Sequence, residues 1–244
     1  MKIWLSLFGL YFLLGCSSVF AQFSRILQPA CNSVESLGYK GKTLYEQKQY
    51  AQSIDYFKRQ AAWSNYCIDR QEHLLSNIPV ESAAMAMKNV ALTHIKLGQP
   101  QWARAWLLPF AGTPHSDPYL KKLSIPQQPK LLTGYYMQYS SEGSWNYFQV
   151  IRTKNHYQLQ YMQHHFYALE SRFKALKYFT IRMPASQQNT SFQSGSCQIR
   201  LGFEFNSQWG QHIVAKQNSG DGVCVQNDHN LWVDGPYIKV ESRP

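Results

Sequence analysis

The spacing of apolar residues changes once along this 244-residue chain, and that change constrains the fold more than any other feature. Between residues 32 and 122, apolar side chains recur every three or four positions, which is the period of a helix packed on one face. From residue 130 the period becomes two, that of a strand with one buried face. Four prolines between residues 114 and 129 separate the two regions. The sequence therefore predicts an α+β protein, with helices followed by a small antiparallel β-barrel or sandwich.

Two stretches of the helical region, Gly41–Ala61 and Met87–Phe110, share a pattern of small and large residues broken near the middle. The pattern resembles the tetratricopeptide repeat, in which paired helices nest against each other. Ser53 and Ala103 take equivalent small positions, 50 residues apart, and the turn position holds Lys48 in the first unit and Gly98 in the second. The resemblance implies a groove that holds a peptide or helix. A plain helical bundle without a groove is the alternative.

Short segments with alternating apolar residues fill the second half of the chain, separated by turn signals such as SSEGS and NSGDG. We expect eight strands, at residues 131–139, 145–152, 156–163, 176–183, 197–205, 211–217, 223–227 and 237–240. Strands of this length and spacing are typical of a barrel or sandwich.

An apolar run, Ile3–Leu14, follows Lys2 at the start of the chain. It is shorter than the ~20 residues that a membrane-spanning helix needs, and it has the make-up of a secretory signal peptide. Cleavage after Ala21 is one interpretation. The other is lipidation, because Leu13-Leu14-Gly15-Cys16 resembles the bacterial lipobox, in which the cysteine is acylated and becomes the new N-terminus.

We favour acylation of Cys16, and Ser17 after it resembles the outer-membrane sorting signal. The expected location is then the periplasm, as a lipoprotein anchored in the outer membrane, with a soluble periplasmic or secreted protein as the alternative. We expect the signal peptide at residues 1–21 (or 1–15 in a lipoprotein), a helical domain at 23–112, a proline-rich linker at 113–129 and the β domain at 130–244.

The four other cysteines are an even number in an exported protein, which favours disulfide bonds. Of the three possible pairings we expect Cys31–Cys67 with Cys197–Cys224, because each bridge then stays within one region of the chain.

The net charge of +10 is spread over both halves of the chain, without a run of five basic residues. We therefore exclude nucleic acid as a partner, because such proteins concentrate basic residues on one face or helix. The dispersed charge suits an anionic cell envelope or an acidic protein partner.

A search for catalytic patterns leaves little. Ser171 and Lys174 match the nucleophile–base spacing S-x-x-K, but the companion K-T-G motif is missing. The adjacent His164 and His165 would point to opposite faces of a strand, which disfavours a shared metal. We expect no catalytic, cofactor-binding or metal-ligating residues.

The β half also resembles the small disulfide-bearing barrels of periplasmic inhibitor-like lipoproteins. The likeness rests on an opening strand Gly134-Tyr135-Tyr136, a late cysteine on a strand, and a closing Asp234-Gly235-Pro236-Tyr237-Ile238-Lys239. It implies an inhibitor or immunity protein directed against a periplasmic hydrolase.

Together these patterns indicate a non-enzymatic binding protein of the bacterial envelope, with an envelope or periplasmic protein as its partner. An assembly scaffold is the other form of this hypothesis. One alternative is a lipid or small-molecule carrier, whose cavity would be lined by Tyr135, Tyr157, Tyr161 and Phe203. An uncharacterised envelope hydrolase is the second alternative.

Overall fold

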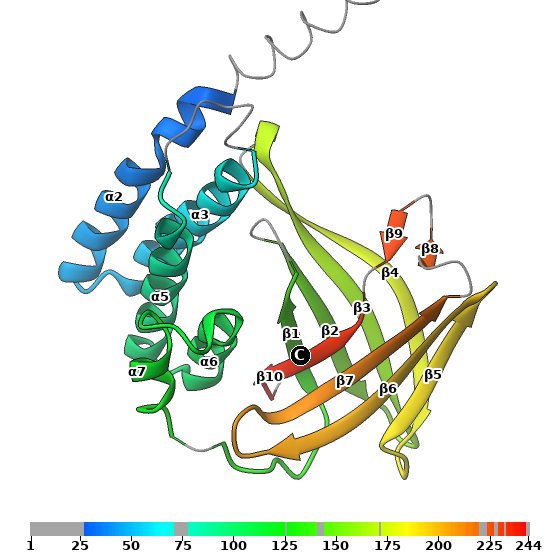
Figure 1. Ribbon diagram of the computed structural model, residues 1–244. Coiled ribbons are helices and arrows are strands. Elements are labelled where there is room, and N and C mark those ends of the chain that lie inside the picture. Colours follow the sequence, from blue (N-terminus) through cyan, green and yellow to red (C-terminus); the bar gives the residue numbers. More distant parts are fainter. Residues whose placement is uncertain are drawn as a thin grey trace, which may run out of the picture.

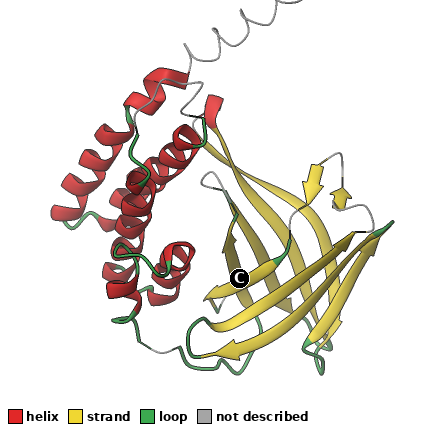
Figure 2. Ribbon diagram, viewed as in Figure 1, coloured by secondary structure: helices red, strands yellow, loops and turns green. Residues whose placement is uncertain are grey.

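The computed structural model describes residues 27–70, 78–124, 126–140, 144–170, 172–219, 224–226, 229–231 and 233–242. Helices lie on one side of the molecule and a strongly curved antiparallel sheet on the other (Figures 1 and 2). The protein is therefore α+β with a β-barrel. Cys16 and the expected signal peptide lie outside the described residues. Within those residues, no helix has both the length and the hydropathy needed to span a membrane.

Among the helices whose full bounds are described, four have eight or more residues, and two short ones follow them. Their bounds are α2 (Val34–Glu46), α3 (Tyr50–Ile68), α5 (Glu81–Lys96), α6 (Pro100–Leu107), η1 (Leu108–Phe110) and α7 (Asp117–Leu120). Helix α7 lies within the segment that we expected to be a linker, and its N-terminus carries Pro118, which has no N–H to lose there.

The turns of the two helical hairpins repeat the same geometry 50 residues apart. Lys48 between α2 and α3 has φ 61°, and Gly98 between α5 and α6 has φ 71°. In each turn the next N–H donates to a carbonyl five residues back, from Gln49 to Leu44 and from Gln99 to His94, both at 2.9 Å. Lys48 thus adopts the left-handed conformation that glycine normally fills.

Small residues let α2 and α3 pack closely. The Ser53 hydroxyl donates to the carbonyl oxygen of Gly41 at 2.8 Å. A Cβ at Gly41 would lie 2.7 Å from the ring of Phe57, so this close approach requires glycine. The Cys31–Cys67 disulfide joins α3 to the helical residues 27–32 that precede α2.

Ten strands are described in the second half of the chain. Eight form one antiparallel sheet in the order β4-β3-β2-β1-β10-β7-β6-β5, and β8 and β9 form a separate pair. Their bounds are β1 (Gly134–Tyr139), β2 (Trp145–Arg152), β3 (His156–Tyr167), β4 (Arg172–Pro184), β5 (Asn189–Ser194), β6 (Cys197–Asn206), β7 (Gly210–Ser219), β8 (Cys224–Gln226), β9 (His229–Leu231) and β10 (Gly235–Glu241).

The expectation of eight strands was incomplete. It missed β5 and β9, and the strand expected at 223–227 corresponds to β8, which pairs with β9 outside the eight-stranded sheet. Strands β3 and β4 are also longer than predicted, because their pairing continues from the barrel to Tyr167 and Arg172.

The sheet curves into a barrel that is nearly closed. Among the described residues no ladder joins the outermost strands β4 and β5, although Phe179 of β4 stacks on Phe192 of β5 with ring centroids 4.3 Å apart. In the middle of the sheet, β10 lies between β1 and β7 and joins the strands β1–β4 to the strands β5–β7. Side-chain stacking therefore holds together the two edges that backbone hydrogen bonds leave apart.

Aromatic and aliphatic side chains fill the barrel interior. Tyr136, Tyr161 and Tyr237 are fully buried there, and the hydroxyl groups of Tyr136 and Tyr237 donate to backbone carbonyls at 2.7 and 3.0 Å. Three of the residues expected to line a carrier cavity (Tyr157, Tyr161 and Phe203) belong to this packed cluster. The fourth, Tyr135, was misplaced: it packs with the helices in a different cluster, because its neighbour Tyr136 faces inward.

The helices and the barrel share a hydrophobic core. Outward-facing residues of β1, β2 and β10, including Met137, Trp145 and Ile238, pack with α3, α5 and α6. A second contact lies at the far end of the β3–β4 hairpin, where the Phe166 ring meets Trp63 of α3 with centroids 5.1 Å apart. Two separated contacts thus fix the helices against the barrel wall.

Candidate functional site

A groove of about 440 Å³ lies on the helical part, between α2, α3 and α5. Its lining includes Tyr39 and Tyr45 of α2, Phe57 and Gln60 of α3, and Met85 and Asn89 of α5. The walls come from the first helix of each hairpin, because α2 and α5 both precede a turn of the same geometry.

Two large apolar side chains of the groove walls are exposed. Tyr39 has 72% of its surface accessible, and Met85 has 43%. Side chains of this kind gain most from being covered by a partner, and tyrosine and methionine are enriched in binding surfaces. Phe57 below them is 3% exposed and belongs to the helical core. The side chains of Tyr39 and Met85 on the walls are therefore accessible to a partner, whereas Phe57 on the floor is packed in the helical core.

Amide groups add polar chemistry to the groove. Gln60 packs against Gly38, where an added Cβ would lie 2.5 Å from its Nε2. Its Oε1 is buried without a hydrogen-bond partner among the described residues. The Asn89 side chain lies on the opposite helix and also lines the groove. Amides carry both donors and acceptors, which match the N–H and C=O groups of a peptide backbone.

Charges of both signs border the groove. Glu35 and Lys42 of α2 line it, and Lys42 Nζ lies 3.9 Å from Glu46 Oε1 in an exposed pair. Burial raises the pKa of Tyr45, and the nearby Tyr50 raises it further, so the Tyr45 hydroxyl stays protonated and can donate. The groove is thus suited to a ligand of mixed polarity rather than to a strongly charged one.

The sequence candidates for chemistry lie elsewhere. Ser171 is outside the described residues, and Lys174 pairs with Glu170 on the surface. His165 Nε2 lies 2.8 Å from Gln163 Oε1, whereas the His164 ring packs on Tyr147 with centroids 4.5 Å apart. Among the described residues, no group of three or more His, Cys, Asp or Glu side chains is placed to hold a metal ion.

The four cysteines form the pairs favoured from the sequence. Cys31 is bonded to Cys67 and Cys197 to Cys224, with Cα–Cα distances of 5.9 and 5.2 Å. The second bridge ties β8 to the start of β6. The disulfides brace the two parts of the molecule and leave none of these four thiols free for chemistry.

Sequence reasoning predicted a groove but not the residues that line it. Tyr39 lies one helical turn from Glu35 and Lys42, a spacing that places all three on one face of α2. Tyr45 lies on the same face and also lines the groove, so two tyrosines among polar residues were the available signal. The contribution of Met85 depends on how α5 packs on α3, which the sequence alone does not specify.

Comparison with known proteins gives no relatives. No protein-family model matches the chain, no curated protein matches its sequence, and no solved structure matches its fold.

Proposed function

We propose that this chain is a non-enzymatic binding protein of the bacterial envelope that engages a protein partner through the groove between α2, α3 and α5. The observation that carries the proposal is the groove itself, with Tyr39 and Met85 exposed on its walls above a packed floor. Contiguous apolar groups that stay exposed on a folded protein mark interaction sites.

The occupant is a peptide segment or a helix of the partner. Its apolar side chains would cover Tyr39 and Met85, while Gln60 and Asn89 would meet its polar groups. We also propose that the two helical hairpins are degenerate tetratricopeptide repeats. The turns at Lys48 and Gly98, which share one backbone conformation, support this classification.

The proposed location is the periplasm, with an acylated Cys16 anchoring the chain in the outer membrane. The two disulfides support an oxidising compartment. A soluble periplasmic or secreted protein is the alternative. Mass spectrometry of the mature N-terminus separates the two, because a lipid-bearing Cys16 supports the anchor and an N-terminal Gln22 refutes it.

Two forms of the function remain within the proposal, an inhibitor or immunity protein of a periplasmic hydrolase and an assembly scaffold. The braced barrel would supply a second rigid face in either case. A lipid or small-molecule carrier is the alternative, although three of the side chains that would line its cavity (Tyr157, Tyr161 and Phe203) pack in the hydrophobic cluster of the barrel interior.

A photoreactive amino acid in place of Tyr39 tests the groove in intact cells. We expect crosslinks to one dominant partner, which is then purified for titration with the unmodified protein. The double variant Y39A/M85A should weaken that binding by about tenfold or more, since central aromatic anchors contribute most of the affinity.

The matched control is V80A/F205A, which also removes two exposed apolar side chains but outside the groove. Equal affinity of Y39A/M85A and the wild type would refute the groove as the binding site. Loss of the partner's hydrolytic activity at one-to-one stoichiometry would identify an inhibitor, and several substoichiometric partners would identify a scaffold.

A further inference from the structure

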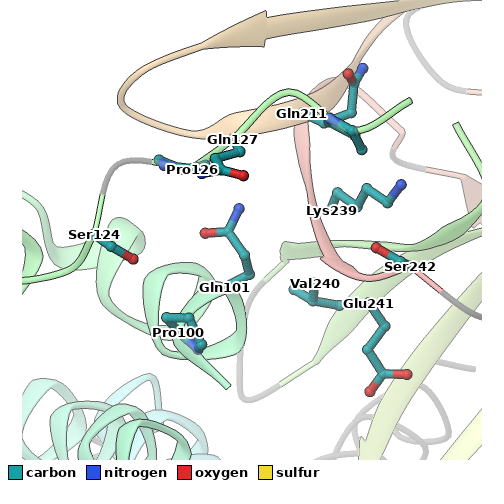
Figure 3. Close-up of a pocket in the computed structure, with 11 residues that line it drawn as sticks. Pro100, Gln101, Ser124, Pro126, Gln127, Gln211, Lys239, Val240, Glu241 and Ser242 are labelled. Carbon is teal, nitrogen blue, oxygen red and sulfur yellow. The ribbon is translucent and has the colours of Figure 1, made fainter. Parts of the chain in front are cut away.

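A second cavity, of about 330 Å³, lies where α6, the proline-rich segment and the barrel meet (Figure 3). Polar residues from distant parts of the chain line it, together with three prolines and Val240. Gln101 is contributed by α6, Gln127 by the proline-rich segment, Gln211 by β7, and Lys239 and Ser242 by β10 and the residue after it. The cavity therefore exists only in the assembled fold.

Lys239 is the unusual residue of this cavity. Its exposed fraction is 6%, and its Nζ donates to the carbonyl oxygen of Leu131 at 2.8 Å. Among the described residues Lys239 forms no ion pair, that carbonyl is its one hydrogen-bond partner, and its Nζ also lies 5.9 Å from the centroid of the Tyr136 ring. Burial lowers the pKa of Lys239 to about 8, which leaves most of the population charged at pH 7.

The neighbouring acid does not neutralise Lys239. Glu241 lines the same cavity, but the ladder between β1 and β10 is irregular here, so that Lys239 pairs with Tyr136 and Glu241 pairs with Tyr135, whose side chain faces the helices. Glu241 Oε1 accepts a hydrogen bond from Trp102 Nε1 at 2.9 Å. Figure 3 shows its carboxylate pointing away from Lys239. A buried cation whose partners are all neutral, here a carbonyl and an aromatic ring, is costly, and an anion that enters the cavity would offset that cost.

Arg104 fixes the geometry of the walls. This buried guanidinium donates to Gln101 Oε1 at 3.0 Å and to the carbonyl oxygens of Gln208 and Ser124 at 2.9 and 2.8 Å. Because the oxygen of Gln101 is occupied as an acceptor, its NH₂ group is left as the donor. The amide is thus oriented before any ligand arrives.

We propose that this cavity binds a small carboxylate ligand, with Lys239 as the counter-charge and the Gln101 amide as a neutral donor. A monoanion fits better than a phosphate dianion, because the lining holds one cation and Glu241 adds a negative charge at its edge. The volume suits a molecule the size of an N-acylated amino acid. The site is separate from the groove of the proposed function and does not depend on it.

Isothermal titration of the purified protein at pH 7 tests the proposal with N-acetylalanine and its neutral analogue N-acetylalaninamide. We expect saturable binding of the acid and affinity at least about tenfold lower for the amide, the change that loss of one charge-assisted contact produces. Inorganic phosphate should bind more weakly than the acid. Equal affinity for acid and amide, tighter binding of phosphate, or no saturable binding of the acid would each overturn the assignment.

Variants identify the residue. K239M should reduce affinity for N-acetylalanine by about tenfold or more, whereas K122M removes an exposed lysine with the same change in net charge and should not. A ¹⁵N-detected titration of the Lys239 ammonium in the wild type needs no variant. Bound N-acetylalanine should raise the pKa of that group, and an unchanged pKa at saturating ligand would contradict a carboxylate next to it.

Discussion

Trp106 of α6 packs against Trp145 of β2 with ring centroids 4.3 Å apart, and this pair lies in the core shared by the helices and the barrel. Both indole N–H groups are buried without a hydrogen-bond partner among the described residues. The contact is therefore stabilised by apolar burial and ring packing, against the cost of two unpaired donors.

Replacing Trp106 by alanine should lower the free energy of unfolding by about 3–5 kcal/mol, because it opens a large cavity at the contact. W106F should cost less, since it keeps much of the ring and removes one unpaired N–H. Denaturant unfolding measures both. F205A, at an exposed barrel position, is the control and should change the free energy by less than about 0.5 kcal/mol. A W106A protein as stable as wild type would refute a core role.

The two hairpin turns allow a paired test of backbone strain. K48G should raise the free energy of unfolding by about 1 kcal/mol, because lysine pays for a left-handed backbone conformation that glycine adopts freely. G98K should lower it by a similar amount, and only through the backbone, since no atom lies within 4 Å of a Cβ placed there. Thermal or denaturant unfolding would show opposite signs for the two variants. The same sign for both would contradict the equivalence of the turns.

Loss of the Cys197–Cys224 disulfide should act locally as well as globally. The bridge closes a separation of 27 residues, for which the chain-entropy model gives about 3–4 kcal/mol. In C197S/C224S the amides of β8 and β9 should exchange with solvent faster than those of β6, because the bridge and Leu231 tie that pair to the barrel. C31S/C67S is the matched control and should leave β8 and β9 protected. Unchanged exchange in both variants would show that the bridge does not hold the pair.

The stability of the protein should fall as pH decreases from about 6.5 to 4. Burial lowers the pKa of His94 to about 4, with a smaller contribution from the charge of Lys58, although the hydrogen bond to Gln99 opposes it. Between these pH values the unfolded chain binds a proton that folded His94 does not, so stability is complete above the unfolded pKa and declines below it. The loss is on the order of 3 kcal/mol.

H94F tests this origin, since a phenyl ring can keep the stacking on Trp102, whose centroid lies 5.3 Å away. Its free energy of unfolding should change less between pH 7 and 4.5 than that of the wild type. His164, whose pKa burial also lowers, would supply the remaining slope. An identical pH dependence in H94F and wild type would exclude His94 as the source.

The spacing of apolar residues predicted the division into helices and sheet, because each half of the chain keeps one spacing over a long stretch. It located β2 to the residue, since Trp145, Phe148 and Val150 provide strong apolar signals at its start and along its inner face. It missed β5 because Asn189–Ser194 has one large apolar residue, Phe192, and its other side chains are polar. The edge strand β5 is held by its pairing with β6 and by the stacking of Phe192 on Phe179. Neither contact produces a periodic pattern of apolar residues in the sequence.

The sites were harder to predict for a different reason. Both depend on residues that are far apart in the chain, as with Gln101 and Lys239 in the second cavity. Strand alternation can assign Lys239 to the inward face of β10. It does not predict which residues surround that side chain, so the sequence gives no sign that the lysine is buried beside a cavity. Composition and spacing therefore bound the class of protein, and packing decides where a ligand fits.

The position of β10 has a consequence for the order of events during folding. Its residues 235–241 pair with β1, about a hundred positions earlier, and also with β7. Neither of these two ladders can form until residues 235–241 have been synthesised. The helical hairpins need only contacts between neighbouring segments and can form well before that. The helices should therefore assemble before the barrel. In a chain that ends after β7, Met137 and the edge of β1 that β10 normally pairs with would stay exposed to solvent, where chaperones and proteases can bind.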